Sequence, residues 1–168
     1  QYMDWISRLE KLDDVIDQYI ALANQGIENQ VMPPKVLMSR VLNQIKLQNV
    51  DSYINSPFYD AFEVLPDEIS NQEQEQIREQ AQITITNVVI PSYVKLLNFF
   101  ENSYYPNCRD TIGISDIKNG SQYYELIAKQ FTTTELTPDE IHNIGLSEVT
   151  RIKNEMFKIM DQVQWNGS

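Results

Sequence analysis

The chain has 168 residues, 42% of them hydrophobic, which is enough for one domain with a packed core and too apolar for a disordered chain. Its 24 acidic and 13 basic side chains give a formal net charge of -11, so a phosphate backbone would be repelled and we expect no nucleic acid partner. An anionic membrane surface is disfavoured for the same reason, and no apolar run approaches the roughly 20 residues of a transmembrane helix.

The N-terminal residues predict a helix that is already under way. They have neither the basic segment nor the apolar stretch of a signal peptide, so we expect the chain to begin inside a longer protein. Apolar residues at alternating steps of four and three predict one helix from about Met3 to Gln25, with Gly26 near its end. The apolar stripe of this helix consists of Trp5, Leu9, Leu12, Ile16, Tyr19, Ala23 and Ile27.

A second helix is predicted to start at the pair Pro33 and Pro34, because proline is well tolerated in a first helical turn. Residues 49–57 are polar and turn-like, and the run SPFY at Ser56 to Tyr59 predicts a short docked segment. The inner face of the second helix would carry Leu37, Val41 and Ile45.

A long helix is predicted to start at a capping-box pattern, in which Glu73 lies three residues after Ser70. Its interior contains the β-branched run ITITNVVI, residues 83–90, which alternates like a strand and precedes Pro91. The polar, strongly helical residues before this run favour a helix that bends at Pro91. The inner face would carry Ile77, Ala81, Ile85, Val88, Leu96 and Phe99.

The C-terminal third predicts an irregular segment followed by two helices. Residues 104–120 contain a proline and two glycines and read as irregular, and residues 121–131 predict a short helix. Thr137 as cap, Pro138 at the first helical position and Glu140 three residues past the cap predict a last helix to about Gln164. One side of it would carry Ile141, Gly145, Glu148, Ile152, Met156, Ile159 and Val163.

These elements predict an all-α protein, in which long antiparallel helices pack as a bundle or array without a substantial sheet. The sequence has no internal repeat, no low-complexity tract and no clear domain boundary. We therefore expect residues 1–168 to form a single helical domain or subdomain.

The chain offers little chemistry that could act alone. With one histidine and one cysteine it has no HExxH pair and no cysteine cluster, so we expect no metal site and no catalytic residue of its own. A carboxylate-only site at Asp13, Asp14 and Asp17 is conceivable, but these residues read better as a solvated helix face. Cys108 could pair with His142 as a nucleophile, although a lone cysteine more often serves packing.

Four residues are candidates for lining a substrate cleft. His142 could donate a hydrogen bond into a cleft, or be a partly buried, hydrogen-bonded residue of the first helical turn. Tyr123 and Tyr124 could present phenol groups, but helical spacing points them differently, so at least one should belong to a core. Arg109 with Asp110 could clamp a carboxylate, or fix an irregular loop through a local salt bridge, which is the better reading.

Several motifs together resemble one family. They are the Pro33-Pro34 pair after a glycine, SPFY at 56–59, PSYVKLLNFF at 91–100, YYPNCRDTIG at 104–113, NGSQYY at 119–124, and TTTELTPDEIHNIGLSEVTRI at 132–152. Each motif is weak, and their order and spacing are more specific. In this order they are similar to the N-terminal part of the bacterial domain-of-unknown-function family 885, which includes lipoproteins.

The resemblance implies a helical fold related to zinc metallopeptidases that carry HExxH on a helix. In the family this motif lies beyond the matched region, so zinc is implied for the parent protein and no zinc ligand is carried over to this chain. The resemblance makes Tyr123, Tyr124 and His142 the best cleft candidates, and Arg109 stays a fourth candidate from its own chemistry. The implied partners are the remainder of the parent chain and a peptide substrate, and the implied location is the cell envelope or periplasm.

Two hypotheses follow. The first is the cleft-forming helical part of a zinc-dependent, peptidase-like hydrolase, inactive alone because the metal motif is absent. The second is a non-catalytic helical binding or scaffold domain of the bacterial cell envelope. A complete small enzyme using Cys108 or clustered carboxylates is disfavoured, because the chain has too few ligands and nucleophiles.

Overall fold

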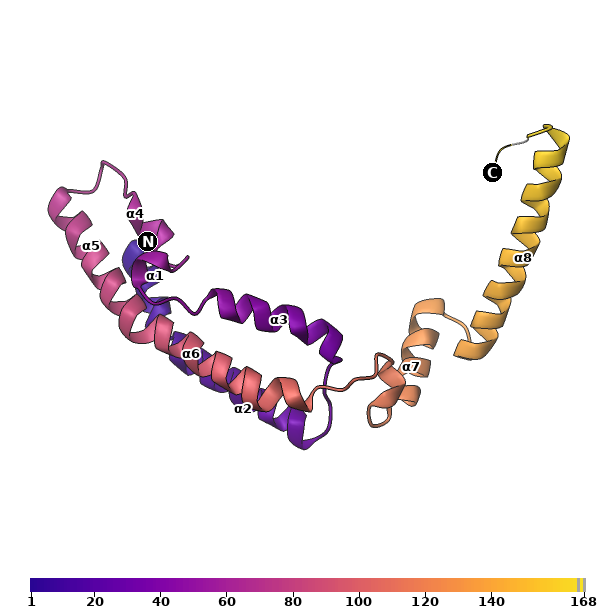
Figure 1. Ribbon diagram of the computed structural model, residues 1–168, viewed down its shortest axis with the longest axis horizontal. Coiled ribbons are helices and arrows are strands. Elements are labelled where there is room, and N and C mark those ends of the chain that lie inside the picture. The colour runs from indigo at the N-terminus through magenta and orange to yellow at the C-terminus, as the bar shows by residue number, and fades with distance from the viewer. Residues whose placement is uncertain (166, 168) are drawn as a thin grey trace. The chain divides into compact units, whose positions relative to one another are not determined.

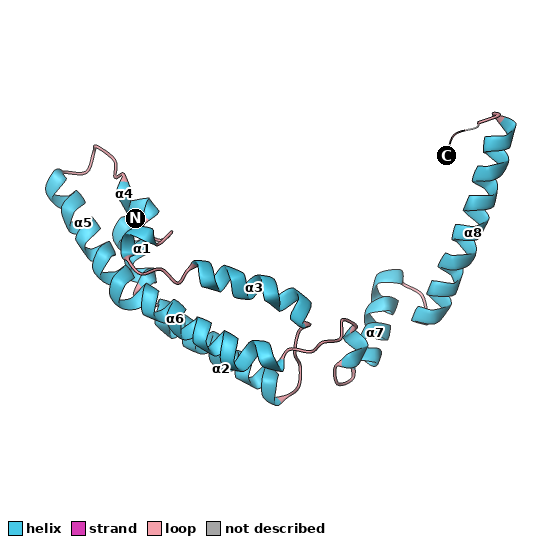
Figure 2. Cartoon of the chain, in the orientation of Figure 1, coloured by secondary structure: helices cyan, strands magenta, loops and turns pink. Residues whose placement is uncertain are grey.

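The computed structural model describes residues 1–165 and 167, in two compact units, Gln1–Ile112 (unit 1) and Gly113–Ser168 (unit 2). Every regular element of the described residues is helical, and an isolated bridge between Pro34 and Arg109 is their one β pairing (Figure 2). The predicted all-α class is confirmed. The expectation of a single domain stays a prediction.

The first predicted helix is two helices, α1 (Tyr2–Leu9) and α2 (Leu12–Glu28). The break lies at Glu10 and Lys11, where the Lys11 amide turns to the carbonyl three residues back, at 3.1 Å. Neither residue is glycine or proline, so the sequence carries no local signal for it. The break lets α1 pack on α5 while α2 packs on α6, two helices defined below (Figure 1).

The end of α2 also lies later than Gly26 predicts. The amide of Val31 donates to the carbonyl of Gly26 at 2.9 Å, and the amide of Gln30 donates to that of Ile27 at 3.1 Å. This pair of bonds is a Schellman motif, with Gln30 in the left-handed conformation at φ 58°. Glycine is the usual residue there, and its absence at position 30 explains the misplaced end.

The next helix, α3 (Lys35–Leu47), starts one residue after the proline pair, with Pro34 in the cap position. It runs in the direction opposite to α2 and packs on α6 (Figure 1). The SPFY segment is docked as predicted: Ser56 is buried and Phe58 packs against the core. It leads into the short helix α4 (Asp60–Glu63), which contributes the fully buried Phe62.

One continuous helical rod, Asn71–Asn107, runs through unit 1. It consists of α5 (Asn71–Thr84), a π-helical turn (Ile85–Val89), α6 (Ile90–Phe99), a second π-helical turn (Phe100–Tyr104) and a 3-10 turn (Tyr105–Asn107). The β-branched run, residues 83–90, is therefore helical, as the polar residues before it predicted. The predicted capping box is present, with the Ser70 hydroxyl and the Glu73 carboxylate bonded to each other's backbone amide.

Each π turn ends two residues before a proline, and the residue between them caps the turn. The amide of Ile90 donates to the carbonyl of Ile85, and the amide of Tyr105 donates to that of Phe100, both five residues back. Pro91 and Pro106 follow, and neither can donate a helical hydrogen bond. A wider turn changes the carbonyl spacing where a proline ring would clash with the preceding turn, so the rod continues through both prolines.

The core of unit 1 lies where α1, α4 and the rod meet. Phe62 has 0% exposure and sits among the buried side chains of α1 and the rod. Its ring lies 6.1 Å from that of Tyr2 and 6.3 Å from that of Tyr59, centroid to centroid. The buried cluster consists of Ile6, Leu9, Phe62, Ala81, Ile85 and Val89.

By length and composition alone, the rod Asn71–Asn107 is long and apolar enough to cross a membrane, and it is the one such helix among the described residues. The sequence analysis expected no apolar run of about 20 residues, whereas this helix passes the test on its length and its mean hydropathy. Core helices pass the same test. Because Ala81, Ile85 and Val89 carry the core, we interpret the rod as the core helix of unit 1.

Unit 2 contains a 3-10 turn (Ile114–Asp116) and two helices, α7 (Gly120–Thr132) and α8 (Pro138–Gln162). Both helices match their predicted ranges within two residues. The predicted capping box of α8 is present, with the Glu140 carboxylate accepting from the Thr137 amide at 2.8 Å. The 3-10 turn packs closely on α7 at Gly120, where an added Cβ would overlap the carbonyl oxygen of Ile114.

Replacing Gly120 with alanine is expected to destabilise unit 2, because the backbone at Ile114 would have to move. We expect a loss of about 1–3 kcal/mol, typical of overpacking, seen as faster amide exchange along α7. Gly145→Ala is the matched control: nothing lies within 4 Å of its added Cβ, and alanine would stabilise α8 by about 1 kcal/mol. Unchanged exchange in Gly120→Ala would contradict the close packing.

Candidate functional site

Arg109 fixes the loop that follows the rod. Its Nε donates to the carbonyl of Met32 at 3.0 Å, and its Nη1 donates to that of Thr111 at 2.8 Å. Its backbone amide donates to the carbonyl of Pro33, and its own carbonyl accepts from the Lys35 amide at 2.8 Å. These bonds tie the segment before α3 to the end of the rod, which is the loop role that the sequence favoured.

The salt bridge at this loop has a different partner from the one expected. Asp110 pairs with Lys35 at 3.1 Å, joining the loop to the first turn of α3. Cys108 is buried, and its thiol donates to the carbonyl of Tyr104 at 3.4 Å. Burial raises the pKa of the Cys108 thiol, which lowers its thiolate fraction and agrees with a packing residue.

Tyr123 and Tyr124 lie on α7 and are 53% and 52% exposed. The expectation that at least one of them belongs to a core is therefore wrong. Gly120 is the buried residue of α7, so neither face of this helix packs into a hydrophobic core. Both phenol groups are accessible on the surface of unit 2.

His142 lies in the first turns of α8 and is exposed, not partly buried as expected. No residue of this 25-residue helix is buried. The structure places Tyr123, Tyr124 and His142 in unit 2 and Arg109 in unit 1. The four pockets described for the chain are lined by none of them.

The acidic cluster on α2 is part of an ion-pair network with α6. Lys95 Nζ lies 2.6 Å from a carboxylate oxygen of Asp13 and 2.6 Å from one of Asp17. The buried hydroxyl of Ser92 donates to Asp13 at 3.0 Å. Lys95 thus takes the position that a bound cation would need, so these carboxylates join two helices.

Asp13 and Lys95 each stabilise the charged form of the other. The hydrogen bonds from Lys95 and Ser92 lower the pKa of Asp13. The same contacts from Asp13 and Asp17 raise the pKa of Lys95. Among the described residues no group of three or more His, Cys, Asp or Glu side chains is placed to hold a metal ion.

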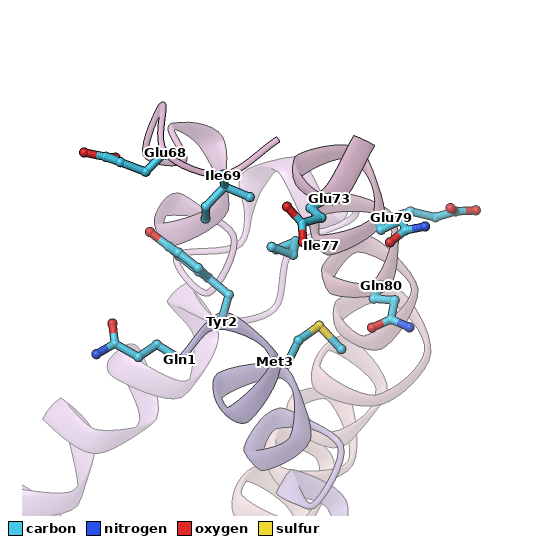
Figure 3. A pocket seen from close by; sticks show the side chains of 10 residues that line it. Gln1, Tyr2, Met3, Glu68, Ile69, Glu73, Ile77, Glu79 and Gln80 are labelled. Atoms are coloured by element: carbon cyan, nitrogen blue, oxygen red, sulfur yellow. The ribbon is translucent and has the colours of Figure 1, made fainter. Parts of the chain in front are cut away.

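The largest of the four described pockets, about 780 Å³, lies between the start of α1 and α5. Figure 3 shows Tyr2 and Met3 of α1 near Ile69 and Ile77, with the carboxylates of Glu68 and Glu79 pointing away. Glu73 at its rim is engaged in the capping box, and these bonds lower the pKa of its carboxyl group. The lining therefore mixes apolar and polar side chains, and its uncharged polar residues are Gln1, Gln76 and Gln80.

A second pocket, about 500 Å³, lies between α1, α3, the SPFY segment and α6. Sequence reasoning missed it, because its residues come from four separate segments. The proline and phenylalanine of SPFY could have indicated this pocket, because a docked aromatic segment has to pack against other parts of the chain. The lining consists of Trp5, Val41, Gln44, Ile45, Gln48, Pro57, Phe58 and Tyr93.

Comparison with known proteins agrees with the motifs. Residues 1–168 match the family described as "Bacterial protein of unknown function (DUF885)". A solved structure, titled as the putative lipoprotein from Colwellia psychrerythraea, is 26% identical with a TM-score of 0.76. The match covers 99% of this chain and 29% of that chain, so this chain spans less than a third of that relative. No curated protein matches.

Replacing Lys95 with methionine is expected to lower the melting temperature most between about pH 5 and pH 9. Because the pKa of Asp13 is lowered in the folded state, its contribution to the free energy of unfolding is present above about pH 4. This contribution is lost as the pH falls through the folded pKa. The raised pKa of Lys95 means its contribution is present below about pH 10 and is lost as the pH rises through the folded pKa.

Thermal unfolding across this pH range checks the prediction, with Lys158→Met in unit 2 as the control for removing a surface lysine. A difference between wild type and Lys95→Met that stays the same at pH 3 and pH 7 would show that the network is not the cause.

Proposed function

Because the chain belongs to the bacterial DUF885 family, we propose that it is the substrate-positioning helical part of a larger, zinc-dependent, peptidase-like hydrolase. It would be inactive alone, and the remainder of the parent chain would be its partner. The envelope location belongs to the same proposal, since the similar solved structure is titled a lipoprotein.

The observation that carries this proposal is the uncovered apolar surface of unit 2. α8 has no buried residue, and Phe131 of α7 is 81% exposed. Single exposed apolar side chains are ordinary, but a whole apolar face along a long helix marks an interaction surface. Along α8 and its C-cap residue, the exposed large side chains are Ile144, Leu146, Val149, Ile152, Met156, Phe157, Ile159 and Val163.

The partial coverage of the similar solved structure suggests what covers the apolar surface of unit 2, namely the remainder of a longer protein. This chain covers 29% of the similar solved chain, so most of that relative consists of residues with no counterpart here. The periodic stripe Ile152, Met156, Ile159 and Val163 fits a helix packed on further helices. A larger body that covers α8 would also give Tyr123 and His142 a cleft to line.

The residues of this chain do not fit a zinc site. Zinc needs three or four nitrogen, sulfur or carboxylate ligands, and the described residues hold no such group. The proposal therefore places the metal and the catalytic base in the remainder of the parent, and it assigns no catalytic step to this chain.

The role left to this chain is to hold a substrate in position. Rigid helices that orient an extended substrate reduce the entropy lost when it reaches the reactive geometry. Tyr123, Tyr124 and His142 are accessible for this role. Arg109 already donates to two backbone carbonyls, which favours the loop function over a substrate contact.

A non-catalytic binding or scaffold domain of the cell envelope is the second candidate function. The observation that favours it is the second pocket, which has no ionisable carboxylate, lysine, arginine or histidine in its lining. Such a pocket can bind a ligand but offers no acid or base for hydrolysis.

Zinc content and peptide hydrolysis of the full-length parent, measured beside the 168-residue chain, test the proposal. We expect about one zinc ion and hydrolysis of a mixed peptide library in the parent, and neither in the chain. Chelation should remove hydrolysis from the parent without unfolding this chain. A folded parent without zinc and hydrolysis would favour the binding domain, and tight stoichiometric zinc in the chain alone would contradict the placement of the metal.

A further inference from the structure

The second pocket differs from its surroundings in charge. All of its lining side chains are uncharged, in a chain that has 22% charged residues and a net charge of -11. The pocket of about 780 Å³ beside α5, in contrast, is rimmed by Glu68, Glu73 and Glu79. Burying a charged ligand group here would cost desolvation without an opposite charge to offset it. The lining therefore selects an uncharged ligand.

The polar groups of the pocket match peptide groups. Gln44 of α3 and Gln48, the residue that caps this helix, lie four residues apart with helical backbone, so their side chains are neighbours on one face. Each amide offers a carbonyl acceptor and an N–H donor, the same pair that a peptide unit presents. Burial raises the pKa of Tyr93, so its phenol stays a neutral hydrogen-bonding group.

The remaining walls suit apolar side chains. Val41, Ile45, Pro57 and Phe58 are apolar, and Trp5 adds a broad half-exposed aromatic surface. A sugar presents hydroxyl groups in most directions, and those facing these walls would lose their hydrogen bonds to water without replacement. A peptide has apolar side chains beside its polar backbone, which is the pattern that the pocket offers.

The walls are also held in place before any ligand binds. The side-chain amide of Asn49 donates to the carbonyl of Ile45 at 3.0 Å and to that of Tyr93 at 3.4 Å, which ties α3 to α6. The rings of Phe58 and Tyr93 lie 5.8 Å apart, centroid to centroid. A preformed pocket spends less binding free energy on ordering its own side chains.

We propose that this pocket binds a short uncharged peptide segment that carries an apolar side chain, with Gln44 and Gln48 bonding its backbone and Trp5 covering its side chain. The pocket volume of about 500 Å³ lies within the range of small-ligand sites. This proposal adds a binding site to the proposed function. The binding of the peptide is argued from the pocket lining alone, and only the later hydrolysis of the bound peptide rests on the proposed function.

Trp5 provides the measurement. The chain has two tryptophans, and Trp165→Phe leaves Trp5 as the one that reports. Titration of this variant with the neutral peptide acetyl-Gly-Leu-Leu-Gly-amide should give a saturable change in fluorescence. Acetyl-Gly-Glu-Glu-Gly-amide should bind at least about tenfold more weakly, a difference of roughly 1.4 kcal/mol.

Variants test the role of the two amides. Gln44→Glu combined with Gln48→Glu should weaken binding of the neutral peptide by about tenfold or more. The matched control, Gln18→Glu combined with Gln82→Glu, adds the same charge at exposed positions of unit 1 and should leave binding unchanged. Circular dichroism of both double variants checks that the helices are intact.

Three results would overturn the proposal: no saturable response to the neutral peptide, equal binding of both peptides, or binding of triacetylchitotriose in place of the peptide. The outcome is separable from the proposed function. A Trp5 response to the peptide with an inactive, zinc-free parent would keep the pocket and remove the hydrolase. An active, zinc-containing parent without a Trp5 response would keep the hydrolase and remove the pocket.

Discussion

Pro91 and Pro106 lack the amide proton that an α-helix uses, and each follows a residue whose own amide bonds five residues back. These two π turns keep Asn71–Asn107 a single rod where prolines would otherwise end it. The rest of unit 1 depends on that continuity. The N-terminal half of the rod meets Phe62 in the core, while its C-terminal half carries Lys95 to α2 and Tyr93 to the pocket beside α3.

The two units differ in how they satisfy their apolar residues. Unit 1 buries a cluster around Phe62, so it has its own core, and the side-chain and backbone hydrogen bonds of Arg109 close its last loop. Unit 2 has one buried residue on α7 and none on α8. A helix pair of this kind gains little from burial, and its apolar side chains are best explained by a larger body that packs on them. The proposed role as part of a longer protein joins these two observations.

The parts of the fold that could be predicted have local causes. Both capping boxes were visible in the sequence because Ser70 with Glu73, and Thr137 with Glu140, are each three residues apart. The break at Glu10 and Lys11 could not be predicted, because tertiary packing causes it. The exposure of Tyr123 and Tyr124, and the pocket around Trp5, depend on which segments meet in space. Helical periodicity identifies the apolar face of a helix, but it does not identify the segment that packs on that face.

Amide hydrogen exchange of α8, compared between the 168-residue chain and the full-length parent, tests most directly whether this chain is one part of a larger folded body. The account predicts that residues 138–162 exchange at least about tenfold more slowly in the parent, because the rest of the protein covers their apolar face. Residues 77–89, which have a core in unit 1, should exchange alike in both. Equal exchange of α8 in the two proteins would contradict the account.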